Sequence, residues 1–94
     1  MIDTYRICLS RGKEKKVLLD VPCTEEYIKA IVNGSFRGRF SKPDGLRVSD
    51  GIKLIVINKG MRSVVMARRI YNKSMRQVMT TIKKAINDTP LIYG

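Results

Sequence analysis

The residues of this 94-residue chain that are best suited to chemistry are its arginines and lysines. In the segment 35–42 (SFRGRFSK), Arg37 and Arg39 flank a glycine, and Phe36 and Phe40 flank the arginines. Guanidinium groups pair bidentately with phosphate oxygens, and aromatic rings stack on bases. The segment therefore suits a nucleic-acid or nucleotide site in which Arg37, Arg39 and Lys42 contact phosphates and Phe36 and Phe40 stack on bases. The same alternation also fits a strand with its phenylalanines in the core and its arginines in water.

A second basic cluster, Arg68, Arg69, Lys73 and Arg76, falls where a strand runs into the start of a helix. Exposed amides at a helix N-terminus attract anions, and neighbouring cations strengthen such a site. Lys73 and Arg76 lie at the unfavourable end of the helix dipole, so helix stability does not account for them. Lys83 and Lys84 extend the expected anion-binding set along the same helix. Adjacent residues of a strand point to opposite faces, so Arg68 and Arg69 are expected on different faces unless a bulge intervenes.

Catalysis has little support in this sequence. There is no histidine, zinc-protease motif, P-loop or nucleophile elbow, and Asp44 and Asp50 stand in turn contexts that explain them. Two cysteines without histidine do not make a zinc set. We expect no enzyme activity, no cofactor and no metal.

The two cysteines, Cys8 and Cys23, are expected to be free thiols. If residues 4–10 and 15–22 form a hairpin about Gly12, Cys8 lies opposite Val17 and Cys23 lies near Ile2. The two sulfurs are then too far apart for a disulfide. Free thiols, together with the lack of a signal peptide or membrane span, indicate a cytoplasmic protein.

The net charge of +11 is unevenly distributed along the chain. Residues 1–34 hold six Lys and Arg against five Asp and Glu, whereas residues 35–94 hold thirteen against three. This asymmetry predicts a nearly neutral hairpin-plus-helix part followed by a basic sheet-plus-helix part that faces an anionic partner. A merely solvated basic surface is the alternative.

Periodicity and turn residues predict the elements. Alternating apolar residues indicate strands over 4–9 and 16–21, and Thr24 caps a helix that Asn33 and Gly34 end. Residues 35–42 and 46–48 are expected to be extended, and 52–57 to form a central strand. A three-residue loop with Gly60 left-handed would join it to the strand 61–71, with Leu54 opposite Val64 and Ile52 opposite Met66. Apolar residues at helical spacing from Met75 to Ile86 predict an amphipathic core helix.

These elements predict a single α+β domain over residues 1–94. It has an antiparallel sheet of about five strands and two helices, in the order ββα(β)βββα, with the C-terminal helix packed on the sheet. The expected function is non-enzymatic binding of DNA or RNA through a surface of arginines and lysines. One alternative is a small inhibitory or sequestering protein that binds an anionic nucleotide or the acidic face of a larger enzyme. A membrane-surface role is the third.

Overall fold

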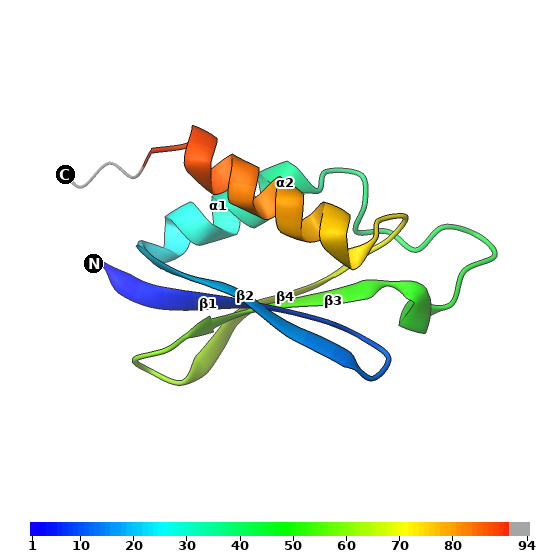
Figure 1. Cartoon of the computed structure of the whole chain (residues 1–94), viewed down its shortest axis with the longest axis horizontal. Helices are drawn as coiled ribbons and strands as arrows, with labels where there is room; N and C mark the ends of the chain where they lie inside the picture. Colours follow the sequence, from blue (N-terminus) through cyan, green and yellow to red (C-terminus); the bar gives the residue numbers. More distant parts are fainter. Residues whose placement is uncertain (91–94) are drawn as a thin grey trace.

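The computed structural model describes residues 1–90, which form a four-stranded antiparallel sheet with two helices packed on one face (Figure 1). The elements are β1 (Asp3–Arg11), β2 (Glu14–Cys23), α1 (Glu25–Ser35), the 3-10 turn η1 (Val48–Asp50), β3 (Ile52–Asn58), β4 (Ser63–Ile70) and α2 (Met75–Asp88). The strand order across the sheet is β2-β1-β3-β4. The predicted α+β class is confirmed, but the sheet has four strands within the described residues and not about five.

The first hairpin follows the sequence pattern closely. Tyr5, Ile7 and Leu9 are buried on the helix-covered face, as their alternation predicts. Cys8 pairs with Val17, which is the predicted register, and Gly12 takes a positive φ of 61° in the turn. Pro22 does not end β2, because an edge strand tolerates a residue without an N–H and the pairing continues to Cys23.

Helix α1 begins where the sequence predicts and ends slightly later. The Thr24 hydroxyl accepts a hydrogen bond from Tyr27 N at 3.1 Å, as an N-cap should. Gly34 does not stop the helix: its φ is not positive, and the helix continues to Ser35. Phe36, which follows directly, is only 1% exposed and anchors the end of the helix in the core.

Residues 36–47 form turns and bends, so the prediction of extended segments at 35–42 and 46–48 was wrong. Gly38 and Gly45 both take positive φ values, and Pro43 lacks the N–H that a sheet ladder needs. The segment instead closes on itself, with Arg39 N donating to Phe36 O at 3.0 Å and Leu46 N donating to Pro43 O at 3.3 Å. The two phenylalanines of this loop still pack toward the core without a strand between them.

The second hairpin has a different register from the predicted one. Leu54 lies opposite Arg68 and Ile52 opposite Ile70, and the turn spans residues 59–62 with the positive φ at Arg62 and not at Gly60. The buried side chain of Asn58 determines this turn. Its Oδ1 accepts from Met61 N at 3.1 Å, and its Nδ2 donates to Asp3 Oδ2 at 3.3 Å. The pairing of β3 with β4 also has an irregularity next to this turn, where the register shifts between Val56 and Ile57.

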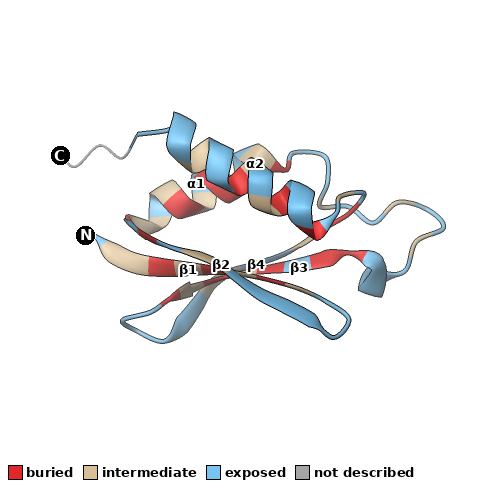
Figure 2. Cartoon of the chain, viewed as in Figure 1, coloured by how far each residue is buried: buried red, intermediate tan, exposed pale blue. Residues whose placement is uncertain are grey.

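The core lies between the sheet and the two helices, and it joins both parts of the chain (Figure 2). Ile52, Leu54 and Val56 of β3 are fully buried and form the core face of that strand. In α2, Val78 and Ile82 are fully buried against the sheet, while the opposite side of the helix is exposed. The helices cover one face only, so the other face of the sheet is open to solvent (Figure 1).

Candidate nucleic-acid interface

Most of the basic side chains have no acidic partner. Within residues 1–90, which contain all nineteen Lys and Arg, four of these side chains form ion pairs: Arg6, Lys16, Lys29 and Lys59. The other fifteen have no ion pair with any described residue. Of the thirteen basic residues in 35–94, Lys59 alone is paired in the described structure, so the charge excess of that part is uncompensated.

The loop after α1 is attached to the end of β4. Tyr71 N donates to Arg39 O at 2.9 Å, and the Arg68 guanidinium lies 5.0 Å from the centroid of the Phe40 ring. A cation at this distance is attracted by the face of the ring. These contacts attach the loop that carries Arg37, Arg39 and Lys42 to the strand end that carries Arg68 and precedes Lys73 and Arg76. We call these six residues the loop corner.

The phenylalanines of the loop are not available for stacking in the way that the sequence indicated. Phe36 is a core residue, so its ring has no face for a base. Phe40 is half-buried against the core, and Arg68 lies over its ring. Lys42 is exposed, but its ammonium donates to Leu46 O at 2.9 Å and to Pro43 O at 3.4 Å. This part of the site offers charge without an accessible aromatic platform.

The start of α2 is already capped. The Ser74 hydroxyl accepts from Gln77 N at 3.1 Å, and the Gln77 side chain accepts from Ser74 N at 2.8 Å. This reciprocal capping box occupies the Gln77 amide, one of the helix N-terminal amides expected to meet an anion. Arg76 is exposed on the first turn and Lys73 is half-buried before it. Lys83 and Lys84 lie on the exposed side of α2, away from the sheet.

Arg68 and Arg69 lie on opposite faces of the sheet, as expected for neighbours in a strand. Arg68 is opposite the buried Leu54, on the helix-covered face, whereas Arg69 is opposite the exposed Lys53, on the open face. The Arg69 guanidinium donates through NH1 to Val48 O at 3.2 Å and to Gly51 O at 3.4 Å. The two arginines therefore do not share one site.

The open face carries a line of polar side chains that runs across all four strands. Ser10 of β1 pairs with Lys15 of β2 on one side and with Lys53 of β3 on the other, and Lys53 pairs with Arg69 of β4. Residues paired directly across antiparallel strands share a face. We call Lys15, Ser10, Lys53 and Arg69 the basic row.

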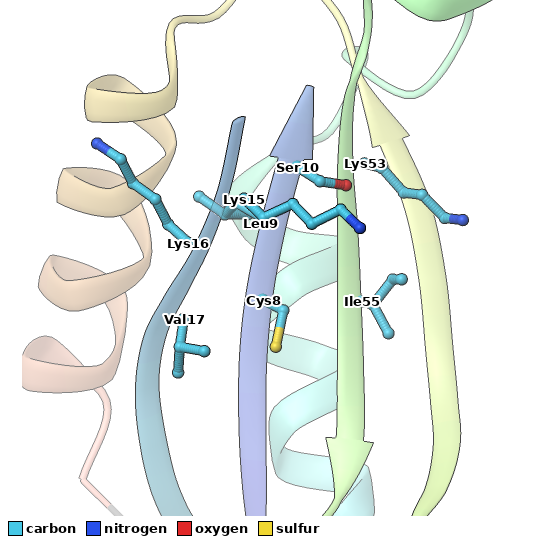
Figure 3. Close-up of a pocket in the computed structure, with 8 residues that line it drawn as sticks. All are labelled: Cys8, Leu9, Ser10, Lys15, Lys16, Val17, Lys53 and Ile55. Atoms are coloured by element: carbon cyan, nitrogen blue, oxygen red, sulfur yellow. The ribbon is translucent and has the colours of Figure 1, made fainter. Parts of the chain in front are cut away.

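Beside the basic row, the open face is apolar. Cys8 pairs with Val17 and Ile55, and Ile55 pairs with Ala67. A hollow of about 410 Å³ is lined by Cys8, Leu9, Ser10, Lys15, Lys16, Val17, Lys53 and Ile55 (Figure 3). The Lys15 side chain extends over β1 toward β3 in this hollow (Figure 3). An adjoining hollow of about 310 Å³ is lined by Lys53, Ala67, Arg68 and Arg69.

The far end of the open face holds an ion-paired group. Arg6 lies opposite Asp20 and donates to both of its carboxylate oxygens, at 2.9 and 3.2 Å, and Lys59 donates to the same carboxylate at 3.1 Å. These hydrogen bonds, first from Arg6 and then from Lys59, lower the pKa of Asp20 to about 2. Asp20 therefore stays ionised well into acid.

The two cysteines are free and occupy different environments. Cys8 is half-buried on the open face, whereas Cys23 is fully buried in the core. Burial disfavours the thiolate and raises the pKa of Cys23 to about 11. The hairpin register that separates the two thiols is the predicted one near Cys8, and Cys23 pairs with Asp3, next to the expected Ile2.

The basic row of the open face was not predicted from the sequence. Lys15 and Ser10 belong to the nearly neutral first part of the chain, and the predicted register of the second hairpin does not place Lys53 opposite Arg69. The hairpin register contained one usable signal, because positions that sum to 25 place Ser10 opposite Lys15. The neighbourhood of β1 and β3, which brings Lys53 to this row, has no local signal.

No known protein family, curated protein or solved structure matches this chain. Neither helix of the described residues is long and apolar enough to cross a membrane. Within residues 1–90, no group of three or more His, Cys, Asp or Glu is placed to hold a metal ion.

Proposed function

We propose that this chain is a small, non-enzymatic nucleic-acid-binding protein that contacts phosphates through its lysines and arginines. The observation that carries the proposal is the set of fifteen Lys and Arg side chains without an ion pair in the described structure. Phosphates of a polynucleotide are spaced regularly and densely, so a basic surface can neutralise several of them at once and release their counterions.

The pairing of Lys53 with Arg69 supports an anionic partner. Like charges directly opposite each other in a sheet are destabilising. No carboxylate of the described residues forms an ion pair with either side chain. A polyanion on the open face would remove this repulsion.

The proposal is tested by titrating fluorescently labelled polynucleotides with the protein over a series of salt concentrations. Each phosphate contact lowers the slope of log affinity against log salt by roughly 0.9 on duplex DNA and 0.7 on single strands. We expect a steep linear decrease that corresponds to several contacts. Absence of binding to any DNA or RNA at low salt would refute the proposal.

A second candidate function is sequestration or inhibition, in which the chain binds an anionic nucleotide or the acidic face of a larger enzyme. The observation that favours it is the apolar surface beside the basic row, formed by Cys8, Val17, Ile55 and Ala67, in which Val17 is 60% exposed. Apolar surface contributes to a protein interface or a nucleotide pocket but not to phosphate contacts. Saturable binding of a mononucleotide, with an affinity that polynucleotides do not exceed, would favour this candidate.

A further inference from the structure

We infer that the nucleic acid is a double helix and that it lies on the open face of the sheet, with the basic row on its backbone. This inference rests on the proposed function and names the partner and the surface. Three observations carry it: where the aromatic rings are, how the cations are arranged on the open face, and where the two hairpin turns point.

The described part of the chain offers no exposed aromatic ring. Its five rings are buried or half-buried: Tyr5, Tyr27, Phe36, Phe40 and Tyr71. None of them lies on the open face, where the central residues are Cys8, Val17, Ile55 and Ala67. Proteins that bind single strands usually stack bases on exposed aromatic rings. A surface of cations without rings instead suits a duplex, whose bases are already stacked and whose phosphates are closely spaced.

Two of the three cations of the basic row have no partner within the described residues. Lys15 and Lys53 have neither an ion pair nor a side-chain hydrogen bond within the described residues, and adjacent strands place the row at intervals of about 5 Å. Arg69 is held at the end of the row by the carbonyls of Val48 and Gly51. In the loop corner, Arg68 covers Phe40 and Lys42 bonds to its own loop.

The two hairpin turns extend the basic surface at both ends of the open face. Both turns curl away from the helices, toward the side of the open face (Figure 1). The β1–β2 turn carries Lys13, next to Arg11 at the end of β1, and the β3–β4 turn carries Arg62 and Lys59, the latter ion-paired with Asp20. The nine residues of β1 span about 30 Å, close to the roughly 34 Å of one turn of a double helix.

The form of the nucleic acid is tested by comparing a DNA duplex with each of its separated strands, and with an RNA duplex of the same sequence, at one low salt concentration. We expect at least one duplex to bind about tenfold more tightly than the single strands, and the two duplexes show which kind of double helix is preferred. Single strands that bind as tightly as both duplexes would overturn this inference but not the proposed function. No binding to any of these probes would overturn both.

The surface is tested with two double variants that remove the same charge. Lys15→Gln/Lys53→Gln removes two positive charges from the open face, and Lys83→Gln/Lys84→Gln removes two from the outer side of α2. We expect the first variant to flatten the salt slope on the duplex by about 1.8, the value for two lost contacts, and the second to leave it nearly unchanged. An equal change in both variants, or a larger one in the α2 variant, would refute the placement.

Cys8 provides a footprint that needs no substitution. Its thiol lies on the open face beside Val17 and Ile55, whereas Cys23 is buried. A duplex on this face should slow the alkylation of Cys8 by iodoacetamide several-fold at saturation, as followed by mass spectrometry of the digested protein. An unchanged rate at saturating duplex would show that the nucleic acid binds elsewhere, whatever its affinity.

Discussion

The ring of Tyr71 lies so close to Gly51 that a Cβ at this glycine would be 2.8 Å from Tyr71 Cε1. Both residues are buried, and Tyr71 N also holds the basic loop through its hydrogen bond to Arg39 O. Glycine at 51 therefore lets the end of β4 close over the start of β3, which positions the loop corner and the end of the basic row.

This contact predicts that Gly51→Ala destabilises the protein, because the tyrosine ring must move out of a packed site. We expect a loss of about 1–3 kcal/mol in the free energy of unfolding, measured by urea denaturation. Gly34→Ala is the matched control: it lies in α1, its Cβ would meet nothing within 4 Å, and it should be neutral or stabilising by up to about 1 kcal/mol. Equal stabilities of the two variants would contradict the packing of Tyr71 on Gly51.

The apolar side of α2 should contribute strongly to stability. Ile82 is fully buried between the helix and the sheet, and Lys83 beside it is exposed. We expect Ile82→Ala to lower the free energy of unfolding by about 2–4 kcal/mol and Lys83→Ala to change it by less than about 0.5 kcal/mol, both measured by chemical denaturation. Small effects in both variants would mean that this side of the helix does not pack on the sheet in solution.

Local patterns predicted the first hairpin but not the second, for a physical reason. The β1–β2 register depends on alternation and on a short turn with Gly12, all within about twenty residues of sequence. The β3–β4 turn depends on Asn58, whose amide reaches Asp3 on the neighbouring strand. A partner 55 residues away in the sequence cannot be found from turn residues alone, and the glycine at 60 suggested a shorter loop.

The loop 36–47 and the open face also could not be predicted from local sequence patterns. Phe36 and Phe40 alternate with arginines as they would in a strand, yet both pack toward the core from a loop closed by two left-handed glycines. The basic row requires β1 to lie between β2 and β3, and this order follows from packing of the whole chain. Charge composition therefore predicted an anionic partner, while the surface that could meet it emerged only in three dimensions.

The buried thiol of Cys23 predicts a loss of stability in alkali. Its pKa is about 11 in the folded protein, against an ordinary value of 9.0, so the unfolded chain ionises first as pH rises. The protonated, buried thiol contributes to the free energy of unfolding fully below pH 9.0. This contribution is lost between pH 9.0 and about 11, at up to about 1.4 kcal/mol per pH unit. The measurement is urea denaturation of the wild type and of Cys23→Ala across this range. Parallel decreases in the two proteins would contradict the burial of the thiol.

The ion pair between Arg6 and Asp20 predicts a loss of stability in acid, whereas Cys23 predicts one in alkali. The pKa of Asp20 is about 2, below its ordinary value of 3.8, so this group stabilises the fold above about pH 4 and loses that contribution as pH falls toward 2. Carboxyl NMR of the Asp20 side chain measures this pKa directly. Arg6→Gln removes the main hydrogen-bond donor and should raise the pKa toward the ordinary value, whereas Lys16→Gln should not change it. An unchanged pKa in Arg6→Gln would show that the pair does not form in solution.

Asp20 also predicts a gain in binding. It is the acidic residue among the strand side chains of the open face, and it neutralises Arg6 and Lys59 there. Asp20→Asn removes this charge and frees both cations, so we expect tighter duplex binding at neutral pH and a steeper salt slope, by up to about 0.9 for each additional phosphate contact. The cost to stability should be small, because exposed ion pairs contribute little.

Asp88→Asn makes the same charge change at the end of α2, without an ion pair to break in the described structure. Equal gains from the two variants would show that net charge, and not the open face, governs affinity.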